Sequence, residues 1–153
     1  MLLENERKKV IEIALKIKAE KLIPLTFGNF SLRDPETGYI CITPSGMPYD
    51  TLHPSDIVVV DVDNNIIDGE RKPSIETPLH TSMYKKRPDV NGVVHTHSTY
   101  CTAWACRDGG MPCITSEAAE LVGGKVNLAS FVPPGSKELA EVTSEAIGQD
   151  KAV

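Results

Sequence analysis

The sequence lacks the features of a membrane or nucleic-acid-binding protein. It has no run of the roughly 18 apolar residues that a membrane span requires, and its first residues are charged rather than apolar. The 16 Lys and Arg residues are scattered and are outnumbered by 21 Asp and Glu, which gives a net charge of −5. Because a phosphate-binding surface needs clustered basic residues, we expect no nucleic acid partner, no membrane partner and a cytoplasmic location.

Cysteine is also scarce, and its spacing is not that of a disulfide scaffold. Cys41, Cys101, Cys106 and Cys113 form no CxxC pair. A chain of 153 residues with 41% hydrophobic content can bury most of its apolar surface without disulfide bonds. We therefore expect four reduced thiols that act as small buried hydrophobes, and a single domain over residues 1–153 without repeats.

Hydrophobic spacing predicts an α/β chain. Val10, Ala14 and Ile17 repeat at helical intervals and predict a helix over 4–21, which Pro24 ends. Further helices are expected from Ser74, as N-cap, to about residue 87, and at 102–106 and 136–147. Short β-rich runs bounded by turn residues predict strands at 30–33, 39–43, 57–61, 66–67, 91–97, 111–115 and 125–128. Residues 152–153 are expected to begin another strand.

The segment Val93-Val94-His95-Thr96-His97 carries the sharpest functional signal. Side chains two apart on a strand point to the same side, so both imidazoles should face the same way. Imidazole nitrogen is a preferred zinc ligand, and the two valines indicate that the strand is buried before it reaches the histidines. The pair predicts a metal site, and the alternative is two hydrogen-bonded histidines near a strand end.

Glu76 and His80 lie on one face of the helix that precedes the histidine strand. A carboxylate in the first helical turn is favoured by the helix dipole, so Glu76 is either a surface residue that complements the dipole or a group aimed at the metal. His80 is either a second such group or a packed helix histidine. His53 precedes Pro54 in a polar loop and is expected to be structural.

Three loops have the composition of an anion cradle, because glycine lets backbone N–H groups approach closely and Ser and Thr add donors. These loops are Thr26-Phe27-Gly28-Asn29, Thr43-Pro44-Ser45-Gly46 and Pro73-Ser74. Each of them is also compatible with an ordinary turn.

Taken in order, these segments resemble the class II aldolase/adducin head family, and within it the fuculose-phosphate aldolases. The resemblance is carried by residues 26–33, 40–46, 73–80 and 87–97. It implies a three-layer α/β/α sandwich with a mixed, largely antiparallel central sheet. It also implies one zinc ion per subunit and a homotetramer with the active site near a subunit interface. The expected activity is cleavage of a ketose 1-phosphate, such as L-fuculose 1-phosphate, to dihydroxyacetone phosphate and an aldehyde.

The resemblance assigns roles to residues that match the family's motifs. His95 and His97 correspond to two of three zinc histidines, and Glu76 to the carboxylate that rests on the metal and serves as catalytic base. The phosphate-binding positions correspond to Gly28, Asn29, Ser45, Gly46, Ser74 and the backbone of Ile75.

The sequence also departs from the family pattern. The third zinc histidine is expected shortly after Val153, so the chain is expected to stop before the family's C-terminal strand and helices. Ile75 stands where the aldolases usually have a phosphate-binding Ser, and an alkyl side chain donates no hydrogen bond. Thr115 and Ser116 stand near the place of a tyrosine in the fuculose-phosphate aldolases.

Other activities of the same family are alternatives. The sister epimerases carry Asp where this chain has Glu76, and an Asp-Tyr-Phe-Tyr-Gly stretch where it has Ser116-Glu117-Ala118-Ala119-Glu120. These differences favour an aldolase over an epimerase. A methylthioribulose-1-phosphate dehydratase and a non-catalytic domain like the adducin head remain as further alternatives, although an adducin head lacks the zinc histidines.

Overall fold

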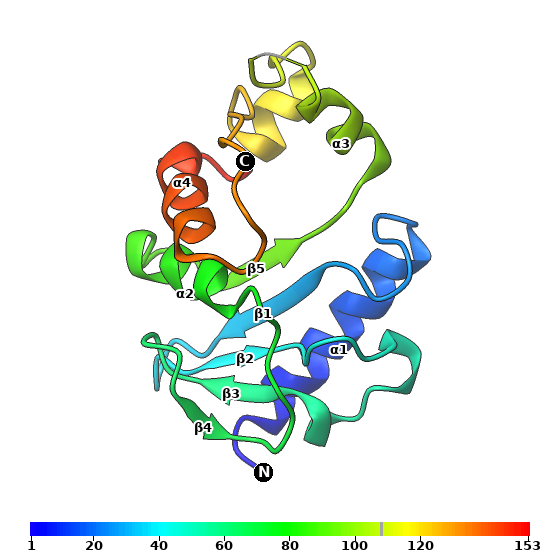
Figure 1. Ribbon diagram of the computed structural model, residues 1–153, viewed down its shortest axis with the longest axis vertical. Coiled ribbons are helices and arrows are strands. Elements are labelled where there is room, and N and C mark those ends of the chain that lie inside the picture. The colour runs from blue at the N-terminus through cyan, green and yellow to red at the C-terminus, as the bar shows by residue number, and fades with distance from the viewer. Residues whose placement is uncertain (108) are drawn as a thin grey trace.

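One five-stranded sheet organises the computed structural model, which describes residues 1–107 and 109–153 (Figure 1). Its order is β4-β3-β2-β1-β5, and each neighbouring pair is antiparallel. The predicted α/β class is confirmed, and the described part of the sheet contains no parallel pair. The strands are β1 (Asn29–Arg33), β2 (Ile40–Ile42), β3 (Val58–Val60), β4 (Ile66–Asp68) and β5 (Gly92–His95).

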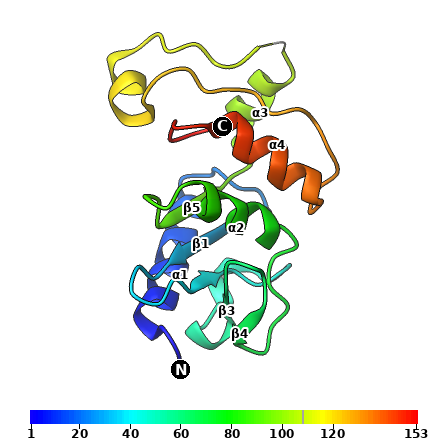
Figure 2. The same cartoon turned by 90° about the vertical axis from the view of Figure 1, so that its left-hand side faces the viewer.

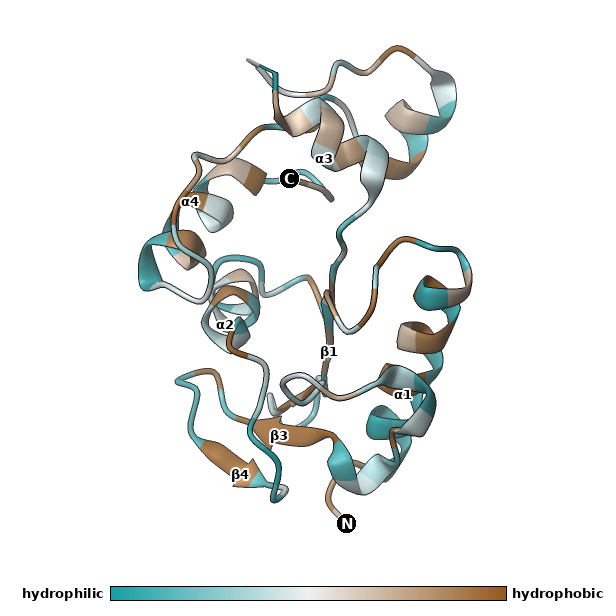
Figure 3. Ribbon diagram, turned by 45° about the vertical axis from the view of Figure 1, so that its right-hand side comes forward, coloured by the Kyte–Doolittle hydropathy of each residue, from teal (hydrophilic) through white to brown (hydrophobic). Residues whose placement is uncertain are grey.

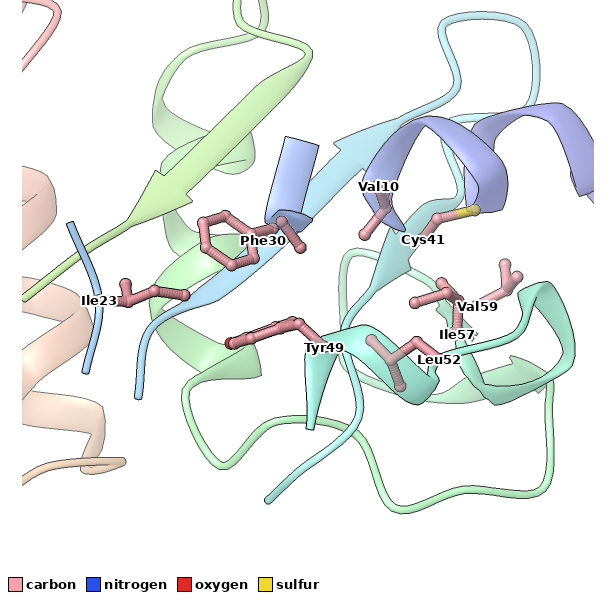
Figure 4. Close-up of a cluster of buried hydrophobic side chains, with 9 residues drawn as sticks. Val10, Ile23, Phe30, Cys41, Tyr49, Leu52, Ile57 and Val59 are labelled. Atoms are coloured by element: carbon pink, nitrogen blue, oxygen red, sulfur yellow. The ribbon is translucent and has the colours of Figure 1, made fainter. Parts of the chain in front are cut away.

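Helix α1 (Glu4–Ala19) covers one face of the sheet, as its helical spacing predicts. Val10 and Ala14 are buried on its inner side and belong to a core that includes Phe30 and Cys41. Figure 4 shows these side chains gathered between α1, the sheet and the segment that carries Tyr49. The 3₁₀ turns of this segment are η1 (Tyr49–Thr51) and η2 (Pro54–Asp56).

Helix α2 (Thr77–Lys86) lies on the opposite face and α4 (Lys137–Ile147) packs against α2, so the expected three-layer sandwich is confirmed (Figure 2). Tyr84 of α2 packs on a second core formed by β2 and β3. The hydroxyl of Ser82 donates to the carbonyl of Ala140 at 3.1 Å and joins α2 to α4. Because both faces of β3 are covered, all three of its residues are valine, and the strand is hydrophobic along its length in Figure 3.

The segment after β5 differs most from expectation. Helix α3 (Thr99–Ala105) begins earlier than predicted, and residues 118–122 form a single π-helical turn. The strands predicted at 111–115 and 125–128 are wrong: one isolated bridge joins Met111 to Val126. Neither run has a buried residue, so no apolar face holds a longer pairing together. Residues 152–153 are likewise outside any strand.

The cysteines are free, as predicted, but only Cys41 is buried. Burial raises its thiol pKa to about 12. The expectation of burial is wrong for Cys101, Cys106 and Cys113, because they lie beyond β5, where the described residues up to 131 form no buried core. His53 is structural, as expected: its backbone N–H donates to the Asp56 carboxylate at 2.9 Å. Among the described residues, no helix has the length and apolar character to cross a membrane.

A buried arginine that the sequence patterns did not single out ties α1 to the loops under the sheet. Arg7 is only 1% exposed and donates to the carbonyl of Leu2 at 2.8 Å and of Pro54 at 3.1 Å. It also donates to the carbonyl of Ile57 and forms an ion pair with Asp68 at 2.6 Å. Every one of these acceptors loses its charged partner if the guanidinium is removed.

We expect Arg7→Met to lower the free energy of unfolding by about 2–4 kcal/mol, because it leaves the carbonyls of Pro54 and Ile57 without this donor and removes the ion pair with Asp68. Urea denaturation measures this change. Lys8→Ala is the control, since Lys8 is exposed and pairs only with Glu4 on the helix surface, and it should cost less than about 0.5 kcal/mol. Equal effects of the two substitutions would contradict the prediction.

Candidate active site

Glu76 stands at the N-cap of α2, two residues later than the N-cap predicted from the sequence. The prediction of Ser74 as N-cap is wrong because the helix begins only at Thr77; the Ser74 hydroxyl accepts the backbone N–H of Glu76 at 3.2 Å in the turn that precedes the helix. Pro78 lies in the first turn, as expected, where a missing N–H costs nothing. The Glu76 side chain is buried rather than displayed on the surface, which excludes a role limited to dipole compensation on the surface.

The carboxylate of Glu76 contacts the ring of His95 at the end of β5. Oε2 of Glu76 lies against Nδ1 of His95, and the amide of Asn29 donates to the same oxygen at 3.4 Å. Apart from this contact with Glu76, His95 Nδ1 has no hydrogen-bond partner, and it is the one such buried side-chain nitrogen or oxygen in the described part of the chain. Burial raises the pKa of Glu76, but His95 and Asn29 outweigh it and the net pKa is lowered.

His97 lies just beyond β5, beside His95. The two rings stack with centroids 5.1 Å apart and planes 14° from parallel, and Phe27 stacks on His97 at 5.2 Å. The expectation that both imidazoles face one side is therefore confirmed. Burial and the neighbouring His95 lower the pKa of His97, although Glu76 opposes them.

The residues assigned to the metal fit zinc in their chemistry but do not form a closed site. Carboxylate oxygen and imidazole nitrogen are zinc ligands, and among the described residues the polar contact of His95 Nδ1 is with Glu76, another member of the set. Across residues 1–107 and 109–153, no three His, Cys, Asp or Glu side chains are arranged to hold an ion. The structure joins Glu76 to His95 and places His97 alongside.

His80 is a packed helix histidine and not a metal ligand. It is fully buried, and its two ring nitrogens lie 2.6 Å from the Ser31 hydroxyl and 2.5 Å from Oδ1 of Asn29. Burial lowers its pKa to about 3. The Ser31 hydroxyl lies 2.7 Å from that of Tyr84, whose pKa burial raises to about 12.

Ser31 and Tyr84 are the site residues that sequence reasoning missed. A signal for the first was present: Asn29 and Ser31 are polar residues two apart on a strand that also carries Phe30 and Leu32. Polar side chains on one face of an apolar strand indicate a buried polar partner on the layer above. Here that partner is His80 of α2.

Two of the three predicted anion loops are joined by backbone hydrogen bonds. Ser45 N–H donates to the Lys72 carbonyl at 2.9 Å, and Ser74 N–H donates to the Thr43 carbonyl at 3.1 Å. The backbone amides of Ser45 and Ser74 are therefore already used. Among the described residues, those of Gly46 and Ile75 donate to no partner in the chain.

The third loop reaches the site through Gly28 and Asn29. Gly28 has φ +82°, and an added Cβ would lie 2.7 Å from Cγ2 of Ile23 and 2.8 Å from the His95 carbonyl oxygen. Glycine is therefore required for the loop to approach β5. The side chain of Asn29, predicted to bind phosphate, contacts Glu76 and His80.

The profile of the family described as "Class II Aldolase and Adducin N-terminal domain" matches residues 8–153. The chain belongs to this family. A "5-deoxy-D-ribulose 1-phosphate aldolase" from Bacillus thuringiensis serovar kurstaki is 36% identical to it over 153 residues, which cover all of this chain and 71% of that protein. The expectation of a class II aldolase-like enzyme of the lyase class is thereby confirmed.

Solved structures agree with this membership. An "L-fuculose 1-phosphate aldolase" superposes with a TM-score of 0.92 at 33% identity, over 96% of this chain and 69% of that one. The L-fuculose-1-phosphate aldolase from Thermus thermophilus has a TM-score of 0.80 at 23% identity, over 97% and 74% of the two chains. The second likeness shows the shared class II aldolase fold alone.

In this class II aldolase domain we expect Gly28→Ala to lower the free energy of unfolding by about 2–4 kcal/mol, because it combines a left-handed backbone with two steric overlaps. Gly38→Ala is the matched control. Gly38 has φ +75° but open space around the added Cβ, so it should cost only about 1 kcal/mol. Denaturant unfolding of both variants tests the difference, and equal costs would show that the contact with β5 is unimportant.

Proposed function

We propose that this protein is a zinc-dependent aldolase that cleaves a ketose 1-phosphate, such as L-fuculose 1-phosphate, to dihydroxyacetone phosphate and an aldehyde. The observation that carries the proposal is the contact between the buried carboxylate of Glu76 and the unpartnered Nδ1 of His95. The names of the two relatives at 36% and 33% identity both describe aldolases of ketose 1-phosphates. Cleavage of a ketose 1-phosphate, which both names share, is therefore a better guide to the function of this protein than the particular sugar in either name.

Glu76, His95 and His97 would hold one zinc ion per subunit. When bound, zinc supplies a Lewis acid for negative charge that develops on the substrate's oxygens. Glu76 would then move the proton: in the condensation direction it takes a proton from dihydroxyacetone phosphate, and in cleavage it returns one to the same carbon. A carboxylate that is buried and contacted by only two side chains can be both held and released for this task.

The phosphate would lie among the three anion loops, at Gly28, Asn29, Ser45, Gly46, Ser74 and Ile75. Support comes from the unused backbone amides of Gly46 and Ile75. Asn29 spends one amide N–H on Glu76, so its second N–H is available to an anion. An anion-binding loop beside the base would place the reacting carbon of a 1-phosphate close to Glu76.

We further propose a homotetramer with the active site near a subunit interface. The described residues beyond β5 carry large apolar side chains that this chain leaves exposed, among them Tyr100, Ile114, Leu121 and Phe131. Exposed apolar groups at this density are typical of interaction surfaces. The cytoplasmic location stays a prediction.

We expect Glu76→Gln in the full-length protein to keep zinc while lowering kcat for aldol cleavage by about 10²- to 10⁴-fold, because the amide cannot accept the proton. His95→Ala should lose both zinc and turnover, since it removes a ligand. Metal analysis and aldehyde release measure the two effects. His53→Gln, which changes a histidine in an exposed loop, is the control, and unchanged cleavage by Glu76→Gln would overturn the base assignment.

A second prediction concerns the departure at Ile75. Ile75→Ser adds a hydroxyl donor beside the backbone amide that we assign to phosphate, so we expect KM for the phosphorylated ketose to fall by about 3- to 10-fold with little change in kcat. Cleavage of the unphosphorylated ketose should be unaffected, and it serves as the control substrate. An equal improvement with both substrates would place the phosphate elsewhere.

A further inference from the structure

A line of buried polar side chains runs from the sheet and α2 to the base. It passes from Tyr84 to Ser31, from Ser31 to His80, from His80 to Asn29 and from Asn29 to Glu76, with separations of 2.7, 2.6, 2.5 and 3.4 Å. All five residues are buried, and His80 is fully so. Within this line, Asn29 is the residue whose side chain contacts Glu76 directly. Tyr84, Ser31 and His80 can act on Glu76 only through the Asn29 amide.

The charge of Glu76 determines the direction of every hydrogen bond in this line. An ionised carboxylate only accepts, so Asn29 must present its Nδ2 and not its Oδ1 to Glu76. Oδ1 of Asn29 then faces Nε2 of His80, and that nitrogen must carry the proton because an amide oxygen only accepts. The assignment of amide and tautomer thus follows from the acceptor at the end of the line.

The remaining bonds follow from the neutral state of His80. With its proton on Nε2, Nδ1 accepts from the hydroxyl of Ser31. Ser31 has then used its only proton, so the hydroxyl of Tyr84 donates to it. Each donor therefore points toward Glu76, and hydrogen bonds aligned in this way polarise one another.

We propose that His80 is a positioning residue: as its Nε2–H tautomer it fixes the amide of Asn29, which in turn holds the Glu76 carboxylate in place for proton transfer. This inference rests on the proposed aldolase function for its catalytic consequence, but the tautomer is a property of the protein without substrate. A turned Asn29 amide would put Oδ1 against the carboxylate and leave Nε2–H of His80 facing an N–H group. Each of these two contacts, oxygen against oxygen and N–H against N–H, is costly in a buried site.

The tautomer is tested by ¹⁵N NMR of the histidine rings in the full-length protein. We expect His80 to be protonated at Nε2 and unprotonated at Nδ1, with its signal assigned by its loss in His80→Gln. A proton on Nδ1 would overturn the proposal. The NMR measurement requires neither substrate nor the His80→Leu variant. It therefore tests the tautomer even if His80→Leu fails to fold.

The positioning role is tested by kinetics. His80→Leu removes the donor to Asn29, and we expect kcat to fall by about 10- to 100-fold, the usual effect of losing a partner behind a ligand, while KM and zinc content stay unchanged. His80→Gln carries an amide N–H and should recover part of the loss.

Two outcomes separate this inference from the proposed function. A folded, zinc-loaded His80→Leu protein with wild-type kcat, in a preparation where Glu76→Gln is inactive, would overturn the positioning role and leave the aldolase intact. If Glu76→Gln itself retains full cleavage, the proposed base is wrong, whereas an Nε2–H tautomer would still confirm the direction of the hydrogen bonds. The control His53→Gln should match the wild type in every assay.

Discussion

The antiparallel pairing of β1 with β5 joins the parts of the candidate site that lie farthest apart along the chain. In its register Asn29 stands opposite His95. The pairing therefore holds these two residues side by side, and Asn29 contacts Glu76 through its amide while His95 contacts it through its ring. Gly28 lets the chain reach this pairing, since any side chain there would overlap the carbonyl of His95. A slip of one residue would turn Asn29 and Ser31 to the other face of the sheet, where α1 packs.

The cost of burying polar groups accounts for the arrangement above that pairing. Asn29, Ser31, His80 and Tyr84 are buried, and each has a partner within hydrogen-bonding distance. Native proteins satisfy buried polar atoms in this way, and an exception requires an explanation. In the described part of this chain the exception is Nδ1 of His95, in contact with the group to which we assign proton transfer. Among the described residues, the one buried side-chain polar atom without a hydrogen-bond partner is thus an imidazole nitrogen that could bind a ligand.

Local patterns in the sequence predicted the elements as far as β5 and also α4, and they singled out Glu76, His95 and His97. Helical spacing predicted α1 and α4, and the alternation of His95 and His97 predicted rings on one side. Tertiary contacts decided what these patterns left open. The Ser74 hydroxyl accepts the Glu76 N–H in a separate turn that precedes the helix, and α2 begins only at Thr77. The network of Ser31 and Tyr84 exists only because a strand and a helix pack together, and the runs near Met111 and Val126 lack the buried face that would make them strands.

The distribution of burial separates proton transfer from substrate choice in the proposed enzyme. Glu76 and the groups behind it are buried between the sheet and α2, whereas none of the described residues from 98 to 131 is buried. Exposed polar positions in that segment, such as Thr115 and Ser116, can therefore change without altering the buried contacts of Glu76. In the proposed enzyme the base and its partners can stay fixed while such exposed positions vary.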